Sequence, residues 1–294
     1  MSLAIGISAA EPVSIGLVEA GHVVAILRED ENGGRSLLAR PMQSLVDELA
    51  ARVRALCVTH QAAPVAVGLG FPGIIRDGIV EESPNLKQAK GSHLRDMLAH
   101  ALDQVGLPMR VAICNDADAI ATGIAAARGH MQKKLRVWTI GQGIGFGRYP
   151  HPHGPFEGGH TVVSLDPKET YCGCGGRGHL EGIMGHRAMR LRFLDLEPEE
   201  VFANAAAGDT RCIQFEQLWH RALAAATATS IHLEGPGKFF ITGPNARFAR
   251  VPLLTQYLQE MVSMSPLQGS VFEIIPDSED LAIIGAAVNA ERQP

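Results

Sequence analysis

The chain has 294 residues, 46% of them hydrophobic and 19% charged, with a formal net charge of −5 at pH 7. That length is more than one compact core usually fills, so we expect two lobes. The composition is ordinary for a globular protein, and the charge balance gives no reason to expect nucleic-acid binding by this chain.

The sequence also argues against a membrane protein or a disulfide-rich secreted protein. No apolar run is long enough to span a bilayer, and Met1–Gly6 lacks the basic start and long apolar segment of a secretory signal. The five cysteines are an odd number, and two of them are separated by a single residue. We therefore expect a reduced, cytoplasmic protein with no membrane partner.

The first part of the chain alternates between strand patterns and helix patterns. Short β-rich runs end in turns containing Gly or Pro, and Leu and Val recur at helical spacing between them. The expected elements are strands at Leu3–Ile7, Val13–Glu19, His22–Arg28 and Val65–Leu69, a strand pair at Ile74–Val80, and helices at Leu45–Leu56 and Leu94–Ala101.

The second part continues the alternation, with polar or Gly-rich turns at the strand ends. The expected elements are strands at Val111–Cys114, Val137–Ile140 and Phe239–Ile241, and helices at Asp116–Ala127, Ile213–Leu233 and Ile283–Ala290. Interleaved strands and helices predict an α/β protein, in which ligands gather at the carboxyl ends of the strands.

Four residues with zinc-ligand chemistry flank a glycine-rich stretch. His160 precedes the pair Cys172 and Cys174, and His179 follows it. Two thiolates and two imidazoles complete a tetrahedral zinc site with no open position, so zinc there is structural. A flexible Gly-rich loop with incidental Cys and His is the alternative, but a histidine on each side of a Cys-x-Cys pair favours zinc.

Two carboxylates lie beside these candidate ligands in the sequence. Structural zinc would fix the loop that carries Glu157 and Glu181, and either side chain can accept hydrogen bonds from sugar hydroxyls. His160 can bind zinc through one ring nitrogen and donate a hydrogen bond to a ligand through the other. The predicted sugar pocket is therefore built around the metal.

The stretch resembles the signature of the ROK family (repressors, open reading frames and kinases of sugars). That signature has Glu-x-Gly-His followed by Cys-x-Cys-Gly-x-x-Gly-Cys-x-Glu, and this chain departs from it only at His179, where an imidazole replaces the last thiolate. The resemblance extends from the turn Gly70–Gly73 to Gly285–Ala287. It implies a two-lobed actin/hexokinase-like (ribonuclease H-like) α/β fold with the sugar in a cleft between lobes formed by residues 1–115 plus about 276–294 and by residues 116–275. It also implies a homodimer.

Asn115 and Asp116 follow a strand directly and begin a helix. Phosphoryl transfer to a hydroxyl needs a carboxylate that orients the hydroxyl and accepts its proton. From the residues alone, an N-cap is the competing interpretation, since Asn and Asp commonly begin helices. The family resemblance implies that Asp116 is the catalytic base and Asn115 a sugar ligand. Similarly, Asn85 is either part of a Pro-Asn turn or, by resemblance to the family's Pro-Asn-Leu segment, a sugar ligand.

Two glycine-rich turns have the character of phosphate-binding loops for MgATP, because backbone N–H groups can approach a triphosphate there. Gly141–Gly147 resembles the family's second phosphate loop, with Gly141, Gly143 and Gly145 in place and Gln142 replacing its Thr. Gly243 resembles part of the Gly-Gly turn near the nucleotide base. These four glycines are the predicted nucleotide-binding residues.

The first phosphate loop departs from the family pattern. Family kinases carry Asp-x-Gly-Gly-Thr-Lys between the first two strands, and this chain has Ser8–Val13 there. The Asp that helps to hold magnesium and both glycines are missing, Pro12 has no backbone donor, and Glu11 adds a negative charge where a polyphosphate would lie. These changes oppose ATP binding.

Two functions are therefore open. One is an ATP-dependent kinase of a hexose or N-acetylhexosamine. The other is a sugar-binding sensor or regulator of the same fold that has lost phosphoryl transfer.

Overall fold

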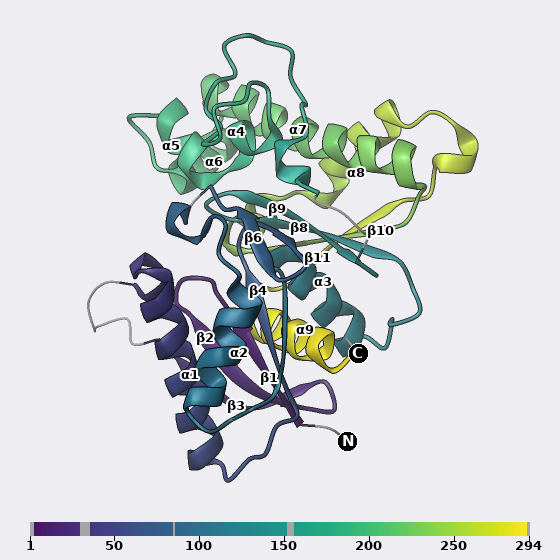
Figure 1. Ribbon diagram of the computed structural model, residues 1–294. Coiled ribbons are helices and arrows are strands. Elements are labelled where there is room, and N and C mark those ends of the chain that lie inside the picture. Colours follow the sequence, from purple (N-terminus) through teal and green to yellow (C-terminus); the bar gives the residue numbers. More distant parts are fainter. Residues whose placement is uncertain (1–2, 30–35, 85, 152–155, 293–294) are drawn as a thin grey trace. The chain divides into compact units, whose positions relative to one another are not determined.

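The computed structural model describes residues 3–29, 36–84, 86–151 and 156–292. The chain divides into two compact units, which are coloured along the sequence in Figure 1. Unit 1 comprises Met1–Lys134, Gly147–Phe156 and Ser278–Pro294, and unit 2 comprises Leu135–Phe146 and Glu157–Asp277. The segment Gly147–Phe156 is therefore a short return of the chain to unit 1 between two parts of unit 2.

Unit 1 is built on a five-stranded sheet with the order β3-β2-β1-β4-β7. The strands β1, β2 and β3 form an antiparallel meander, and β4 and β7 continue the sheet in parallel with β1. The bounds are β1 Leu3–Ser8, β2 Ser14–Glu19, β3 His22–Arg28, β4 Ala66–Phe71 and β7 Arg110–Asn115, and a separate hairpin joins β5 Ile74–Arg76 to β6 Ile79–Glu82. The predicted positions of all these strands are confirmed to within a few residues.

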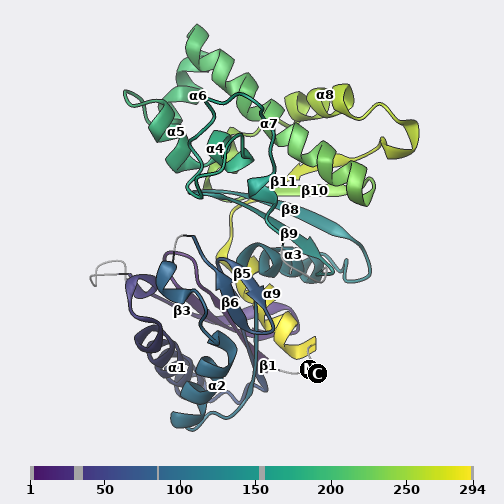
Figure 2. The same ribbon diagram turned by 45° about the horizontal axis from the view of Figure 1, so that its top comes forward.

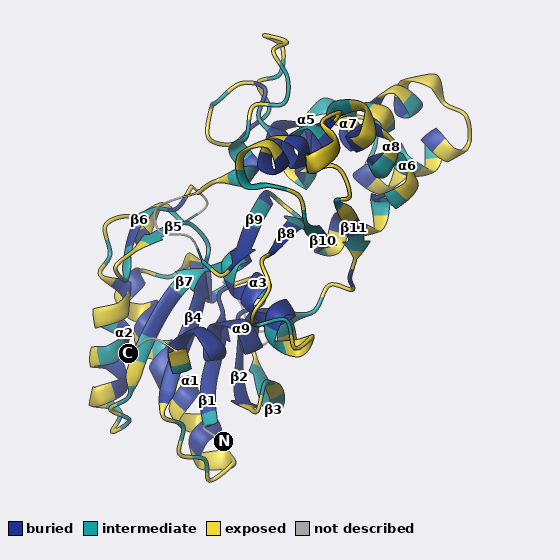
Figure 3. Ribbon diagram, turned by 90° about the vertical axis from the view of Figure 1, so that its right-hand side faces the viewer, coloured by how far each residue is buried: buried dark blue, intermediate teal, exposed yellow. Residues whose placement is uncertain are grey.

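Helices cover both faces of this sheet, and the alternating side chains of the strands decide which face each helix buries. Ile5 and Ile7 pack with α1 (Met42–Thr59) and α2 (Leu94–Gln104), whereas Ala4 packs with Ile283 of α9 (Glu279–Arg292). Figure 3 shows the resulting burial along β1, β4 and β7. The carboxyl end of β7 therefore emerges from a sheet buried on both sides, as parallel strands require.

Helix α3 (Asp116–Ala127) packs directly on α9 within unit 1. Glycine permits the close approach: a Cβ on Gly123 would lie 1.9 Å from the Leu281 carbonyl oxygen, and a Cβ on Gly285 would lie 1.7 Å from that of Ala119. The division of the molecule consequently differs from the predicted lobe boundary after residue 115. Unit 1 extends to Lys134 and takes up α3, and the chain returns to it at Ser278.

Unit 2 contains a four-stranded sheet with the order β11-β10-β8-β9. Its strands are β8 Leu135–Ile140, β9 Ile144–Tyr149, β10 Lys238–Thr242 and β11 Val271–Ile274, and its helices are α4 Leu180–Met184, α5 His186–Arg192, α6 Pro198–Ala206, α7 Thr210–Glu234 and α8 Val251–Met261. Alternate residues of β8 and β10, among them Trp138 and Phe239, share one buried cluster with these helices. Figure 2 shows the helices gathered over the sheet.

None of the helices that the structure describes combines the length and hydrophobicity that a bilayer crossing requires. All five cysteines lie in the described ranges and none forms a disulfide.

Candidate functional site

The loop that follows β9 folds back on itself and brings His160 beside the Cys-Gly-Cys turn. Its 3-10 turn, Gly158–His160, is followed by a β-bridge between Val162 and His179, and the Leu180 N–H donates to the Thr161 carbonyl at 2.9 Å. Gly178 has a positive φ of 67°, and a Cβ there would lie 1.9 Å from the Ser164 carbonyl oxygen. The tight backbone approach that glycine allows thus closes the loop.

The four predicted zinc ligands, His160, Cys172, Cys174 and His179, lie together. One ligand atom from each falls within 4.8 Å of all the others. The two sulfur atoms are 3.3 Å apart, and Cys174 Sγ is 3.2 Å from His179 Nδ1. Tetrahedral zinc with Zn–S bonds of about 2.3 Å holds its thiolates roughly 3.8 Å apart. The donor set and its spacing therefore fit zinc with small adjustments.

The ionisable groups of this cluster shift one another's pKa values. Hydrogen bonds from His160 to Cys172 and Glu157 raise the pKa of His160 to about 10, against the opposing effect of burial. Burial, with the neighbouring Cys172, raises the pKa of Cys174, and burial beside His160 lowers the pKa of His179. A dication would compensate the two adjacent thiolates and would take the place of the proton on His160.

Both predicted sugar-binding carboxylates flank His160. Glu157 Oε2 lies 3.6 Å from His160 Nδ1, and Glu181 Oε1 lies 3.9 Å from His160 Nε2. The Glu181 carboxylate also accepts a hydrogen bond of 3.0 Å from the Ile144 N–H. Glu181 therefore links His160 to the start of β9. The side chains of Glu157, His160 and Glu181 all remain partly exposed to solvent.

The loop is also held by an ion pair that the sequence did not reveal. The Arg192 guanidinium binds both oxygens of Glu169, donates to the Gly182 carbonyl and lies 4.5 Å from the Tyr171 ring centroid. The Glu169 carbonyl in turn accepts from the Gly178 N–H at 2.8 Å. Arg192 thus fastens the loop that carries the predicted zinc ligands to the end of α5, and this contact does not depend on a bound metal.

The predicted phosphate-type turn connects β8 to β9. The Gly141 N–H donates to the Gly143 carbonyl at 3.0 Å, and Gly145 lies within β9. The Gly141 carbonyl accepts from the His186 N–H at 3.0 Å and from Asn245 Nδ2 at 3.4 Å. Sequence reasoning overlooked both of these partners, because neither belongs to a recognisable short motif.

The glycine at the end of the neighbouring strand lies against the same part of the sheet. Gly243 has φ 98°, and a Cβ there would lie 2.6 Å from the Ile140 carbonyl oxygen. Gly141 and Gly243 therefore mark the carboxyl ends of the adjacent parallel strands β8 and β10, where an α/β sheet binds ligands.

In unit 1, Asn115 and Asp116 occupy different positions at the start of α3. Asn115 is the N-cap of α3, and its Oδ1 accepts from the N–H groups of Ala117 (2.9 Å) and Asp118 (3.3 Å). Its Nδ2 donates to the Gly73 carbonyl at 3.0 Å. The cap interpretation is thus confirmed for Asn115, and its contact with sugar stays a prediction.

Asp116 occupies the first turn of α3, where the helix dipole favours a carboxylate. Its Oδ1 accepts from the Ala117 N–H at 2.9 Å. The backbone near Asp116 is also close to Gly70, at the end of β4. The predicted base therefore lies at the carboxyl ends of the parallel strands of unit 1, whereas Asn85 falls outside the described residues.

Two backbone donors of the first loop of unit 1, Ser8–Val13, are bound within the protein. The Ala9 N–H donates to the Gly70 carbonyl at 2.9 Å, and the Val13 N–H donates to Glu29 Oε2 at 3.1 Å. Glu29 Oε1 accepts a second bond, of 2.6 Å, from the Leu37 N–H. An internal carboxylate thus binds an amide of the loop that would face phosphate in a family kinase.

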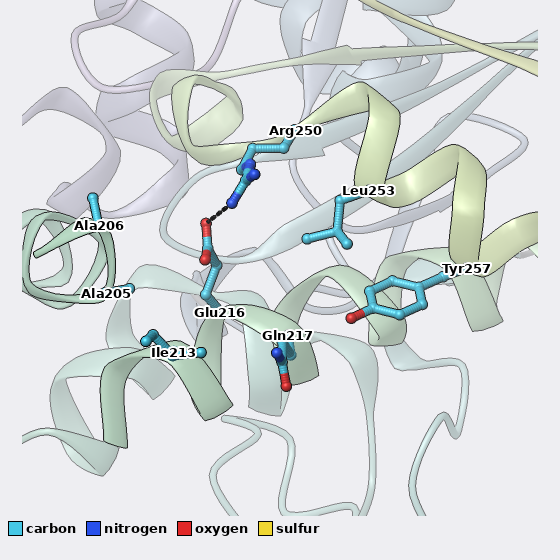
Figure 4. Close-up of a pocket in the computed structure, with 8 residues that line it drawn as sticks. All are labelled: Ala205, Ala206, Ile213, Glu216, Gln217, Arg250, Leu253 and Tyr257. Carbon is cyan, nitrogen blue, oxygen red and sulfur yellow. Dashed lines mark hydrogen bonds and ion pairs between the residues drawn. The ribbon is translucent and has the colours of Figure 1, made fainter. Parts of the chain in front are cut away.

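A separate pocket of about 630 Å³ lies among α6, α7 and α8 of unit 2. Figure 4 shows the ion pair between Glu216 and Arg250 across it, at 3.2 Å, with Leu253 and Tyr257 on the α8 side. None of the predicted site residues lines this pocket.

Solved structures identify the fold of this chain. The ROK hexokinase from Thermus thermophilus aligns with a TM-score of 0.77 and 21% identity, covering 98% of each chain. A ROK family transcriptional regulator, a homologue of the E. coli MLC protein, aligns with a TM-score of 0.74 and 20% identity, covering 98% of this chain and 77% of the regulator. The fold is therefore the two-lobed actin/hexokinase-like α/β fold of these proteins.

Sequence comparison then gives the family. The family model described as ROK family matches residues 19–293, so the chain belongs to the ROK family. Among curated relatives, a glucokinase from Pyrobaculum calidifontis is 27% identical over 245 residues, covering 78% of this chain and 79% of the relative. An N-acetylmannosamine kinase from Citrobacter koseri is 30% identical over 197 residues, covering 62% and 65%. These relatives support a sugar kinase of the ROK type.

Proposed function

We propose that the protein binds a hexose or an N-acetylhexosamine and transfers the γ-phosphoryl group of ATP to one of its hydroxyls, with Asp116 as the base. The observation that carries the proposal is the position of Asp116 in the first turn of α3, immediately after β7. The kinase relatives, which act on glucose and on N-acetylmannosamine, support the class of acceptor.

Three of the proposed sugar ligands belong to unit 2. Glu157, Glu181 and His160 present acceptors and a donor on adjacent side chains, as vicinal hydroxyls require. When bound by His160, Cys172, Cys174 and His179, zinc would supply structure, because four protein ligands leave no coordination position for substrate. Asn85 and Asn115 are the further proposed sugar ligands.

The chemical step uses one carboxylate of this chain. The oxygen of the sugar hydroxyl bonds to the γ-phosphorus of ATP while Asp116 accepts the hydroxyl proton. The bond between the γ-phosphorus and the oxygen that bridges it to the β-phosphate breaks, and ADP is released. The turn Gly141–Gly147 and Gly243 are proposed to bind the MgATP phosphates and the nucleotide base, because both lie at strand ends of one sheet.

Asp116→Asn tests this proposal. The variant should abolish sugar-dependent ADP release while sugar affinity, measured by calorimetry, stays within about twofold, since the carboxamide keeps the shape but cannot accept the proton. Turnover that persists in the variant would remove Asp116 from its role.

The first loop favours a second function, a sugar-binding regulator that does not bind ATP. Its Ala9 and Val13 donors are engaged within the protein, and Pro12 has none. Titration with MgATP, beside a panel of hexoses and N-acetylhexosamines, separates the two functions: sugar binding without nucleotide binding identifies the regulator. A cytoplasmic location is proposed from the number and spacing of the cysteines in the sequence, and a homodimer is proposed from the family resemblance alone.

A further inference from the structure

A cluster of polar side chains surrounds His151 in unit 1, and the proposed reaction uses none of them. His151 lies two residues after the end of β9, and it belongs, with the preceding residues Gly147–Pro150, to unit 1. Its neighbours are Asp118 and Thr122 of α3 and Asn289 of α9. Thr122 is fully buried and Asn289 is buried, whereas 31% of the His151 side chain remains exposed.

The hydrogen bonds around the ring indicate that both its nitrogens carry protons. Nε2 lies 3.0 Å from Asn289 Oδ1 and 3.1 Å from Thr122 Oγ1. The Thr122 hydroxyl proton has acceptors of its own, the Asp118 carbonyl at 3.1 Å and Asn289 Oδ1 at 3.2 Å. Nε2 is therefore a donor to oxygen acceptors.

The other ring nitrogen faces acceptors as well. Nδ1 lies 3.0 Å from the Arg148 carbonyl and 3.8 Å from Asp118 Oδ2. A neutral imidazole carries one N–H and would leave one of these sides without a donor, whereas an imidazolium satisfies both. The Asp118 carboxylate, which also accepts from the Arg148 N–H at 2.9 Å, supplies the opposite charge.

Two guanidinium groups and one thiol complete the ionisable surroundings of the cluster. The Arg148 guanidinium stacks on the Phe156 ring at 3.6 Å, and Arg292 Nη1 donates to the Tyr149 hydroxyl at 2.6 Å. The half-buried Cys114 accepts from Asn289 Nδ2 at 3.2 Å, and desolvation raises its pKa to about 12, so it stays a neutral thiol. On α3, Asp118 is the carboxylate next to the ring, and Asp116 lies earlier on the same helix.

Burial works against the charged imidazole, but it is outweighed. Hydrogen bonding and charge from Asp118, with the Asn289 and Arg148 acceptors, raise the pKa of His151 above its ordinary value. This direction agrees with the donor geometry. Protonation of His151 and attachment of its segment to α3 are therefore linked.

We propose that His151, as an imidazolium paired with Asp118, is a positioning residue that fastens the described residues Gly147–His151 to α3 within unit 1. The same helix carries Asp116 in its first turn. His151 therefore helps to hold the helix that carries the proposed base, and this significance for catalysis rests on the proposed function.

The sign of the pH dependence follows from the raised pKa. The attachment is complete below about pH 6.5, the pKa of an unfolded histidine, and is lost as the pH rises through the higher pKa of the folded state. Asp118→Asn keeps an acceptor for the Arg148 N–H but removes the charge, so the pKa of His151 should fall in this variant.

The test is an NMR titration of the His151 ring with hydrogen–deuterium exchange of the Arg148 amide, in the wild type, Asp118→Asn and His151→Gln. The exposed His22, on β3, provides the matched control His22→Gln. We expect two protonated ring nitrogens at pH 7 in the wild type, a lower His151 pKa in Asp118→Asn, and exchange about threefold to fivefold faster in both cluster variants. The proposal would be overturned if the pKa of His151 were ordinary in the wild type and unchanged in Asp118→Asn. It would also be overturned if the Arg148 amide exchanged at the same rate in the two cluster variants as in the wild type.

Catalytic readouts then connect the attachment to function. His151→Gln should lower kcat more than it raises KM for sugar, and the loss should match that of the wild type at alkaline pH, because both lack the imidazolium. A kcat equal to the wild type at every pH would refute the positioning role. If no sugar binds to the wild type, the proposed function fails, whereas the titration and exchange results still decide the attachment.

Discussion

Asn115 offers a quantitative test of how unit 1 holds its proposed base. Asn115→Ala removes the N-cap acceptor of α3, which costs about 1 kcal/mol, and the Nδ2 hydrogen bond to Gly73, which costs about 1 kcal/mol more. The free energy of unfolding of unit 1 should therefore fall by about 2 kcal/mol. Asn115→Asp keeps an acceptor for the Ala117 and Asp118 N–H groups and loses only the donor to Gly73, so its cost should be about half.

Urea unfolding with zinc present, followed by hydrogen–deuterium exchange of the α3 amides, measures these costs for the element concerned. Equal stability of Asn115→Ala and the wild type would refute the capping argument. Sugar calorimetry on Asn115→Asp adds a separate answer: because the helix is retained, weaker sugar binding in this variant would support direct contact between Asn115 and the sugar.

Three further changes have defined outcomes. Removing metal with a chelator should lower the melting temperature and abolish sugar binding, and zinc should restore both; metal analysis that finds no zinc in the purified protein would contradict the site. Gly143→Ala places a Cβ 2.5 Å from Glu181 Oε2 and should weaken sugar binding about tenfold by displacing a charged hydrogen-bond acceptor, whereas Gly141→Ala, with no neighbour closer than 3.6 Å, should not. Burial lowers the pKa of His220, whose Nε2 accepts a hydrogen bond from the Arg250 N–H. The free energy of unfolding should therefore fall as the pH drops below about 6.5. Urea unfolding of His220→Gln should no longer show this pH dependence.

The parts of the site that were predictable from sequence are those that are local in the chain. The predicted zinc ligands span only residues 160–179, and their grouping follows from a glycine-rich turn that must fold tightly. The position of Asp116 was similarly predictable, because a strand pattern runs directly into a helix pattern at Asn115. In both cases the spacing of residues determines which side chains meet.

The unpredicted contacts join residues whose proximity depends on the fold. His151 meets Asn289 across 138 residues, and α3 meets α9 through two glycines in unrelated parts of the chain. The packing of α3 on α9 is likewise a property of the fold, which the turn signal after β7 does not report.

Glu29 would compete with phosphate for a backbone donor of the first loop. Missing glycines indicated only that phosphate would approach poorly, whereas the structure shows Glu29 bound to the N–H groups of Val13 and Leu37. A phosphate that used the Val13 donor would have to displace this carboxylate. Losing two charge-assisted bonds at about 1.5 kcal/mol each weakens binding by about 3 kcal/mol, or roughly a hundredfold. The glycine turns of unit 2 stay the predicted phosphate-binding residues, and Glu29→Ala should tighten MgATP binding only if the first loop takes part.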